Sequence, residues 1–515
     1  MDGIESLIRT LVAGGVDTCF ANPGTSEMPF VAAVDQVPEL KCVLCLTEGV
    51  VTGAADGYGR MTDRPAATLL HLGVGVANGL SNLHNARKAR SPMINLVGQN
   101  AARHLRHESI LDASIEAPLA AYSDWLRIGR HSMDLAADTA EAIYEARRAP
   151  GRIASLVIQA DAGWGGSPGV ARIRPWSHAP HPAPALVEEV AQRLHASKKA
   201  ILLIDGQALR ERGLVAASRI AAKTGCAAYT PQLWARMERG AGRPVLPEFP
   251  MSVLQAQQVM VGVDTLILVG ARYPTGSFSY PEMPSSPVGD DVQVILLARP
   301  EEDVTAALEA LVDALDARAV ALPPTPVALP KLPPDGDKLT PATMSAIMAN
   351  LLPEHAIVAD EAGLASDFRA ATTAATPHDF LRITGGAIGI VMPLALGAAI
   401  ACPQRPVLAI QGDGCAMYNL QALWTMARHK ANVTVVIYAN RQYKVLLNEL
   451  TRMGVSAPQG NARELLDLGN PPLDWVVLAK GMGVPGSQVT TNGEFFAAIA
   501  KGFSEPGPKL IEAVL

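Results

Sequence analysis

Short apolar runs alternate along this chain with longer segments in which apolar residues recur every three or four positions. The clearest example begins with four apolar residues, Val407–Ile410, which predict a buried strand. The helix expected after it is marked by apolar residues at i, i+3, i+4 and i+7, namely Leu420, Leu423, Trp424 and Ala427. A second strand is predicted over Val433–Tyr438. Strands that alternate with helices in this way are typical of parallel, doubly wound α/β sheets.

The same alternation extends over most of the chain. Further strands are predicted at Lys41–Thr47, Ala67–Leu70, Ile94–Val97, Ala200–Ile204, Thr265–Val269, Val292–Leu297, Ala356–Ala359 and Lys509–Val514. Two stretches, 165–185 and 322–336, are too rich in Pro and Gly for regular elements, and the second has the composition of a semi-rigid linker. We therefore expect three doubly wound α/β domains with parallel sheets, at residues 1–170, 183–325 and 338–515.

Composition agrees with a multidomain globular protein. The 515 residues are 49% hydrophobic and 18% charged, and a chain of this length exceeds what one core supports. The net charge of −6 gives no sign of binding to nucleic acid or to anionic membranes, and no apolar run reaches the roughly 20 residues that span a bilayer. The first residues lack the regions of a signal peptide, and six cysteines form no disulfide framework, so a cytoplasmic protein is expected. Cys42 and Cys45 are predicted to pack in the core rather than to bind zinc.

Polar residues closely follow the two strands that flank the predicted helix. Gly412-Asp413-Gly414 follows the first strand and Asn440 follows the second. Ligands bind at the carboxyl ends of the strands in open α/β sheets. A carboxylate and an amide oxygen brought together there suit Mg²⁺, which commonly takes phosphate oxygens as its remaining ligands. A bare GDG turn is by itself a weak signal.

This arrangement resembles the diphosphate-anchoring motif of thiamine diphosphate (ThDP) enzymes. The resemblance implies that Mg²⁺ is held by Asp413, Asn440 and the backbone carbonyl of Gln442. It also implies that Ile388 lies between the two rings of a bent cofactor, where it should be buried. The other cofactor-binding residues that it implies in this third domain are Glu361, Ala362, Gly363, Gly386, Gly412, Gly414, Cys415, Ala416 and Tyr443.

The N-terminal domain carries the complementary motif. Glu48 follows the strand at Lys41–Thr47 and precedes a predicted helix of small residues, Gly49–Tyr58. Taken alone, Glu48 is most simply a carboxylate that accepts from free N–H groups at a helix start. The segment, however, resembles the GxAADGYxR helix of ThDP enzymes. That resemblance implies that Glu48 binds the aminopyrimidine ring of the cofactor and promotes its reactive tautomer.

Two further segments resemble benzoylformate decarboxylase. The turn from Asn22 to Glu27 is similar to its NPGxxE loop, with Thr25 at the position of the active-site serine. His71 follows the strand Ala67–Leu70, where that family has an acid/base histidine that acetohydroxyacid synthases lack. The chain departs from the pattern in the middle domain, because 270–275 offers no second histidine. These matches make Glu48, His71 and Thr25 the candidate catalytic residues.

The resemblance covers essentially the whole chain. It implies a pyrimidine-binding domain and a diphosphate-binding domain around a central Rossmann-like domain. The leading hypothesis is a ThDP- and Mg²⁺-dependent lyase that decarboxylates a 2-oxo acid. The alternatives are a carboligating transferase of acetolactate synthase type, which joins the product to an aldehyde or a second keto acid, a flavin-dependent oxidase, and a non-catalytic paralogue. No segment argues for FAD.

The resemblance also has a consequence for assembly. In this family the cofactor lies between the pyrimidine domain of one chain and the diphosphate domain of another. We therefore expect a homodimer, or a homotetramer built from two such dimers.

Overall fold

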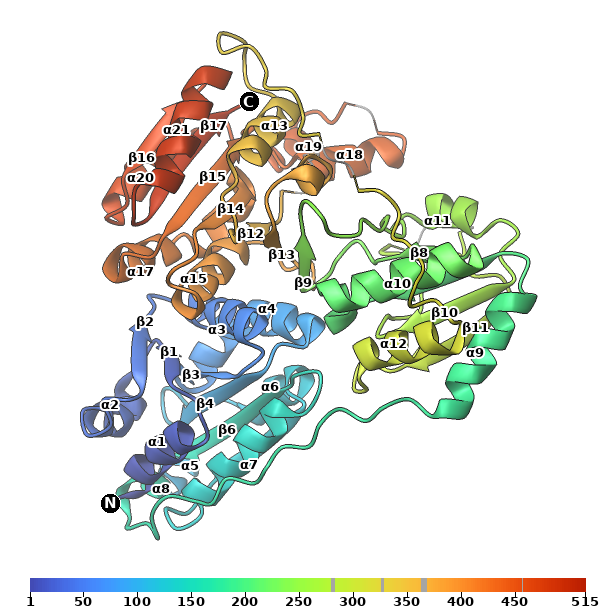
Figure 1. Ribbon diagram of the computed structural model, residues 1–515. Coiled ribbons are helices and arrows are strands. Elements are labelled where there is room, and N and C mark those ends of the chain that lie inside the picture. The colour runs from blue at the N-terminus through green and yellow to red at the C-terminus, as the bar shows by residue number, and fades with distance from the viewer. Residues whose placement is uncertain (279–282, 326–327, 363–367, 456) are drawn as a thin grey trace.

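The computed structural model describes residues 1–278, 283–325, 328–362, 368–455 and 457–515. Three sheets follow one another along the chain, each covered by helices (Figure 1). The described part of the chain contains no helix that is long and apolar enough to cross a membrane. The strands are mostly parallel, as the sequence predicts, and the fold class is confirmed as α/β.

The N-terminal sheet has six parallel strands in the order β2-β1-β3-β4-β6-β5. Its strands are β1 (Thr18–Ala21), β2 (Lys41–Leu44), β3 (Ala66–Leu70), β4 (Met93–Gln99), β5 (Trp125–Gly129) and β6 (Ile153–Gln159). Its helices are α1 (Gly3–Ala13), η1 (Thr25–Glu27), α2 (Met28–Val34), α3 (Glu48–Thr62), α4 (Leu72–Ala89), α5 (Ala102–Leu105), α6 (Glu116–Tyr122), α7 (Leu135–Arg147) and α8 (Ala160–Trp164). Because β1 and β3 are parallel neighbours, the turn after β1 and the residue after β3 meet at one edge.

The middle sheet has four parallel strands in the order β11-β10-β7-β8. They are β7 (Ala200–Ile204), β8 (Ala227–Tyr229), β10 (Thr265–Val269) and β11 (Gln293–Ala298). The helices here are α9 (Pro184–Ala196), η2 (Gly206–Leu209), α10 (Glu211–Thr224), α11 (Val253–Met260) and α12 (Val304–Ala314). Three of these strands match predicted ones, whereas β8 is too short to give a sequence signal.

The C-terminal sheet has seven strands in the order β16-β17-β15-β14-β12-β13-β9. Its own strands are β12 (Ile357–Asp360), β13 (His378–Arg382), β14 (Val407–Gly412), β15 (Val433–Ala439), β16 (Gly486–Val489) and β17 (Lys509–Val514). Its helices are α13 (Pro341–Leu351), α14 (Phe368–Ala371), η3 (Thr372–Ala374), α15 (Val391–Ala401), α16 (Asp413–Ala416), η4 (Met417–Asn419), α17 (Ala422–His429), α18 (Lys444–Arg452), α19 (Asn461–Glu464), α20 (Trp475–Gly481) and α21 (Asn492–Ser504).

One strand of the C-terminal sheet comes from the middle segment. β9 (Arg236–Arg239) pairs antiparallel with β13 at the sheet edge. An ion pair between Arg236 Nε and Asp379 Oδ1, 2.5 Å apart, joins the two strands. The C-terminal sheet is therefore parallel except at this edge, and the domain boundaries themselves stay a prediction.

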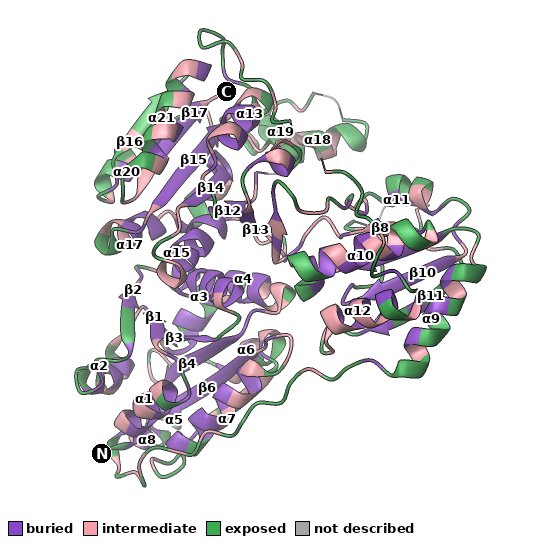
Figure 2. Ribbon diagram, viewed as in Figure 1, coloured by how far each residue is buried: buried purple, intermediate pink, exposed green. Residues whose placement is uncertain are grey.

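The N-terminal and C-terminal sheets share one core, in which α3 and α4 face α15 (Figure 2). Small residues bring α3 and α15 into backbone contact. A Cβ at Gly397 would lie 1.9 Å from the Ala54 carbonyl oxygen, and one at Gly57 would lie 2.1 Å from that of Leu394. The Gly/Ala pattern of α3, which the sequence links to a cofactor, therefore also serves this packing.

One core prediction is wrong. Cys42 is exposed, because β2 is an edge strand that ends at Leu44, earlier than predicted. Cys45 is buried, as predicted.

Candidate active site

His71 and the turn after β1 meet at the carboxyl edge of the N-terminal sheet. His71 is the N-cap residue of α4, and its Nδ1 lies 2.7 Å from Oε2 of Glu27. The same oxygen accepts a hydrogen bond of 2.9 Å from the Gly24 backbone N–H. The His71 side chain keeps 17% of its surface exposed, whereas the Glu27 side chain keeps 1%. The imidazole of His71 is thus partly exposed to solvent, and its Nδ1 contacts the buried carboxyl group of Glu27.

The electrostatics of this pair are dominated by burial. Burial raises the pKa of the Glu27 carboxyl, and the hydrogen bonds from Gly24 and His71 oppose that rise. The backbone is also constrained, since Leu72 directly after His71 has a φ of +50°, a left-handed conformation that is uncommon for a bulky residue. Thr25 lies in the same turn as Glu27 and is exposed.

Glu48 lies at the first position of α3 and is buried. Its Oε2 accepts a hydrogen bond of 3.1 Å from Asn78 Nδ2 on α4. A Cβ at Gly75 would lie 2.9 Å from Glu48 Oε1, so the glycine makes room for the carboxyl. The carboxylate therefore stands in the groove between two helices, close to the start of each.

Asp413 and Asn440 come together as the sequence predicts. They follow the neighbouring parallel strands β14 and β15. Asp413 Oδ2 accepts from the Arg441 N–H at 2.6 Å, and Asn440 Oδ1 accepts from the Gln442 N–H at 3.0 Å. Tyr443 covers the turn, because a Cβ at Gly414 would lie 2.5 Å from its ring.

These residues fit a hard divalent cation. Carboxylate, amide and backbone carbonyl oxygens are the donor types that Mg²⁺ binds. Burial raises the pKa of Asp413, and a bound cation would oppose that rise by favouring the carboxylate. The described residues contain no group of three His, Cys, Asp or Glu side chains that could hold a metal, so any metal here depends on the amide and carbonyl ligands as well.

The remaining third-domain residues lie around this turn. Glu361 accepts from the Gly389 N–H at 3.1 Å and from Gln411 Nε2 at 2.5 Å, and burial raises its pKa to about 7. Burial likewise raises the pKa of the Cys415 thiol, which disfavours a reactive thiolate. The other predicted cofactor-binding residues differ in exposure. Gly412 is partly buried, Ala362 and Ala416 are buried, and Gly386 is exposed. Gly363 lies outside the described residues.

Ile388 differs from its prediction. It is half-buried in the chain, not buried. Its loop is nevertheless fixed from the N-terminal half, because Asn85 donates to the Ala387 carbonyl at 2.7 Å and accepts from the Gly385 N–H at 3.0 Å. The loop is therefore held in place while the isoleucine side chain stays accessible.

Two residues of the site were given no role by the sequence. Glu27 stands in the NPGxxE turn, but only the pairing of β1 with β3 brings it to His71. Asn78 lies seven positions after His71, the N-cap residue of α4, and this spacing places the two residues on the same face of the helix.

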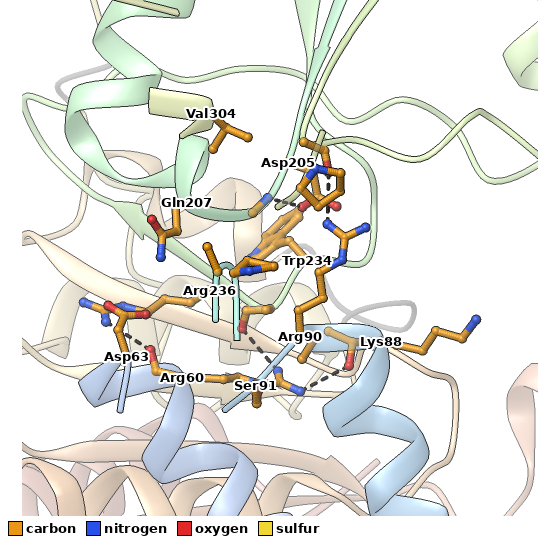
Figure 3. Close-up of a pocket in the computed structure, with 18 of the residues that line it drawn as sticks. Arg60, Asp63, Lys88, Arg90, Ser91, Asp205, Gln207, Trp234, Arg236 and Val304 are labelled. Atoms are coloured by element: carbon orange, nitrogen blue, oxygen red, sulfur yellow. Dashed lines mark hydrogen bonds between the residues drawn. The ribbon is translucent and has the colours of Figure 1, made fainter. Parts of the chain in front are cut away.

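A separate cavity lies at the junction of the three segments (Figure 3). Arg60 and Arg90 of the N-terminal half face Asp205 and Trp234 of the middle segment across it. Burial raises the pKa of Asp205 to about 6. None of the predicted catalytic or cofactor residues lines this cavity in the described part of the chain.

Comparison with known proteins gives a consistent result. The N-terminal thiamine pyrophosphate-binding domain family matches residues 1–116, and the C-terminal one matches residues 364–513. The chain is 45% identical to the "Putative acetolactate synthase large subunit IlvX" of Mycobacterium tuberculosis, over 100% of this chain and 99% of that protein. It is 29% identical to the benzoylformate decarboxylase of Pseudomonas aeruginosa, over 97% of this chain and 96% of that protein.

A solved structure shares the fold. The thiamine diphosphate-dependent 4-hydroxybenzoylformate decarboxylase of Rhodococcus jostii RHA1 superposes with a TM-score of 0.87 at 23% identity, covering 100% of this chain and 99% of that one. The chain therefore belongs to the thiamine diphosphate-dependent enzyme family that includes acetolactate synthase large subunits and benzoylformate decarboxylases.

Proposed function

We propose that this protein uses thiamine diphosphate and Mg²⁺ to decarboxylate a 2-oxo acid. The observation that carries the proposal is the partly exposed imidazole of His71, held by Glu27 at the edge of the domain that matches the N-terminal thiamine pyrophosphate-binding family. A positioned imidazole is the side chain best suited to proton transfer near neutral pH. Bound thiamine diphosphate supplies the electron sink that lets a carboxyl group leave as carbon dioxide.

The roles of the chain's own residues follow from their placement. Asp413, Asn440 and the Gln442 carbonyl would hold the metal and, through it, the diphosphate. Glu48 would hold the aminopyrimidine ring by a hydrogen bond, with Asn78 fixing its carboxyl. His71 would deliver or remove a proton at the reacting carbon. Thr25, exposed in the turn after β1, would donate its hydroxyl to the substrate.

A second candidate function is carboligation of the acetolactate synthase type. It is favoured by the 45% identical relative that carries that description. The two functions differ in stoichiometry. A decarboxylase releases one carbon dioxide and one aldehyde for each 2-oxo acid consumed, whereas a synthase that joins two keto acids consumes two for each carbon dioxide.

The test is a product balance with purified protein, ThDP and Mg²⁺, on aromatic, branched and short 2-oxo acids. Equal amounts of acid consumed, carbon dioxide and aldehyde are expected. Two acids consumed per carbon dioxide would replace decarboxylation by carboligation, and absence of any consumption would remove both. The absorption spectrum of the same sample tests the flavin-dependent alternative.

We further propose that the site is completed by a second copy of the chain. Apolar side chains next to the candidate residues are exposed in one chain, among them Leu46, Val74 and Tyr418 at 43%, 47% and 57%. Helix α18 has no buried residue at all. Apolar surface of this kind, next to a site, is what a partner subunit covers.

Subunit complementation tests this arrangement. Glu48→Gln and Asp413→Asn each remove one end of the site. If the two ends come from different chains, a mixed dimer has one site with both changes and one intact site, so equal mixing should restore about 25% of wild-type activity. If both ends come from one chain, every site carries one change and the mixture stays inactive. Light scattering distinguishes a dimer from a tetramer.

A further inference from the structure

Glu27 uses its two carboxyl oxygens unequally. Oε2 is shared by the Gly24 N–H and by His71 Nδ1, at 2.9 and 2.7 Å. Oε1 is buried and makes no hydrogen bond with the described residues. The Glu27 residue also lines a small cavity of about 20 Å³, together with Gly98 of β4 and Ser26 of η1.

Two glycines shape the space that Glu27 occupies. A Cβ at Gly98 would lie 1.8 Å from Glu27 Oε1, and a Cβ at Gly24 would lie 2.3 Å from His71 Nδ1. Gly98 is an interior residue of β4, where a glycine normally weakens the strand. The carboxyl and the imidazole therefore meet only because both positions lack a side chain.

A structural role alone does not account for this carboxyl. Burying a carboxyl group with one unpaired oxygen is unfavourable, as the raised pKa of Glu27 reflects. Closing the turn at Gly24 needs only one acceptor, which a neutral side chain could provide. The group that gains from an anionic acceptor is His71, whose Nδ1–H the carboxylate can hold.

We propose, on the basis of the function proposed above, that Glu27 is a positioning residue that holds His71 as the Nδ1–H tautomer and leaves Nε2 free to exchange a proton with the substrate. The second ring nitrogen then carries the lone pair. The backbone supports the same geometry, since Leu72 fixes the turn that presents the ring. His71 would take up the proton at Nε2, and the imidazolium would be stabilised by Glu27.

The kinetic test compares Glu27→Gln with Glu27→Leu. The amide keeps an acceptor for the Nδ1–H, whereas leucine fills the apolar space without one. We expect Glu27→Leu to lower kcat by about 10²-fold, the low end for a positioned acid/base group, with little change in KM. Glu27→Gln should recover part of that loss. Equal kcat values for Glu27→Leu and wild type, alongside an inactive His71→Gln, would overturn the proposal.

Gly98→Ala provides an independent variant in which Glu27 itself is kept. Its new methyl group must displace the carboxyl, so the loss of kcat should resemble that of Glu27→Leu. Gly129→Ala is the matched control, because it also adds a methyl to a tightly packed strand glycine of the same sheet, 2.5 Å from Leu135. A kcat loss of the same size in both glycine variants would refute the specific role of the Glu27 contact.

A second readout does not depend on turnover. The ring ¹⁵N resonances of His71 can be measured in cofactor-free protein with labelled histidine, and identified by their loss in His71→Gln. The Nδ1–H tautomer is expected in wild type and in Glu27→Gln, and a shift toward the Nε2–H tautomer in Glu27→Leu. An unchanged tautomer in Glu27→Leu would overturn the proposal, even if wild type decarboxylates no 2-oxo acid and the proposed function itself fails.

Discussion

Replacing Glu361 by glutamine should make the cofactor-free protein more stable at high pH. Glu361 lies beside the predicted diphosphate turn, where burial raises its pKa from 4.5 to about 7. A folded-state pKa above the ordinary value means that the folded protein binds the proton more tightly. The stability from this proton is present below pH 4.5 and is lost as the pH rises through 7.

The size of the effect follows from the same values. A rise from 4.5 to about 7 corresponds to at most about 3 kcal/mol between low and high pH, at 1.36 kcal/mol for each pH unit. The pKa of about 7 already includes the donors that favour the ionised form, because Gln411 and the Gly389 N–H donate to the carboxyl and oppose the effect of burial. Glutamine carries no charge at any pH, so the variant does not lose this stability as the pH rises.

The assay is thermal unfolding of cofactor-free protein at pH 5 and pH 8. The Tm of Glu361→Gln relative to wild type should rise by up to about 5 °C between these pH values, since 1 kcal/mol shifts Tm by about 2 °C in a domain of this size. Glu39→Gln, at an exposed turn, controls for the loss of one negative charge. A Tm difference that is the same at both pH values would refute the assignment of a neutral, partly buried Glu361.

Three other predictions address the site and its support. Glu48→Gln should abolish turnover while the Tm stays close to wild type, and turnover near wild type would remove Glu48 from the mechanism. His71→Gln should lower kcat by about 10²–10⁴-fold, and an unchanged rate across the pH range would make His71 structural. Gly397→Ala should destabilise the protein by about 1–3 kcal/mol, because its Cβ overlaps the Ala54 carbonyl. Gly481→Ala, which has open space around its Cβ, should leave the Tm within error, and equal losses would refute the packing argument.

The part of the site that the sequence predicts is the part built from adjacent elements. Asp413 and Asn440 follow two neighbouring parallel strands that are joined by the helical elements α16, η4 and α17, so their approach is set by local periodicity and by parallel pairing. Glu48 is predictable for the same reason, as the residue between a strand and a helix. The pairing of Glu27 with His71 needs the strand order of the whole sheet, which spacing along the chain does not contain.

Other features depend on contacts between distant segments. β9 has the sequence Arg-Met-Glu-Arg, which carries no apolar alternation, and its place in the C-terminal sheet rests on partners such as Asp379. Cys42 lies on an apolar run, but its exposure is decided by the edge position of β2. Ile388 was predicted to be buried because any role inside the fold would bury it, whereas in one chain it is only half-buried.

The most direct test of the proposed function is carbon dioxide release from an aromatic 2-oxo acid by metal-free, cofactor-free protein to which ThDP and Mg²⁺ are added back. Release is expected only when both are present, with the aldehyde formed in equal amount, and it should be absent from Asp413→Asn at limiting Mg²⁺. Failure to release carbon dioxide from any 2-oxo acid, in protein that binds ThDP and Mg²⁺, would contradict the account.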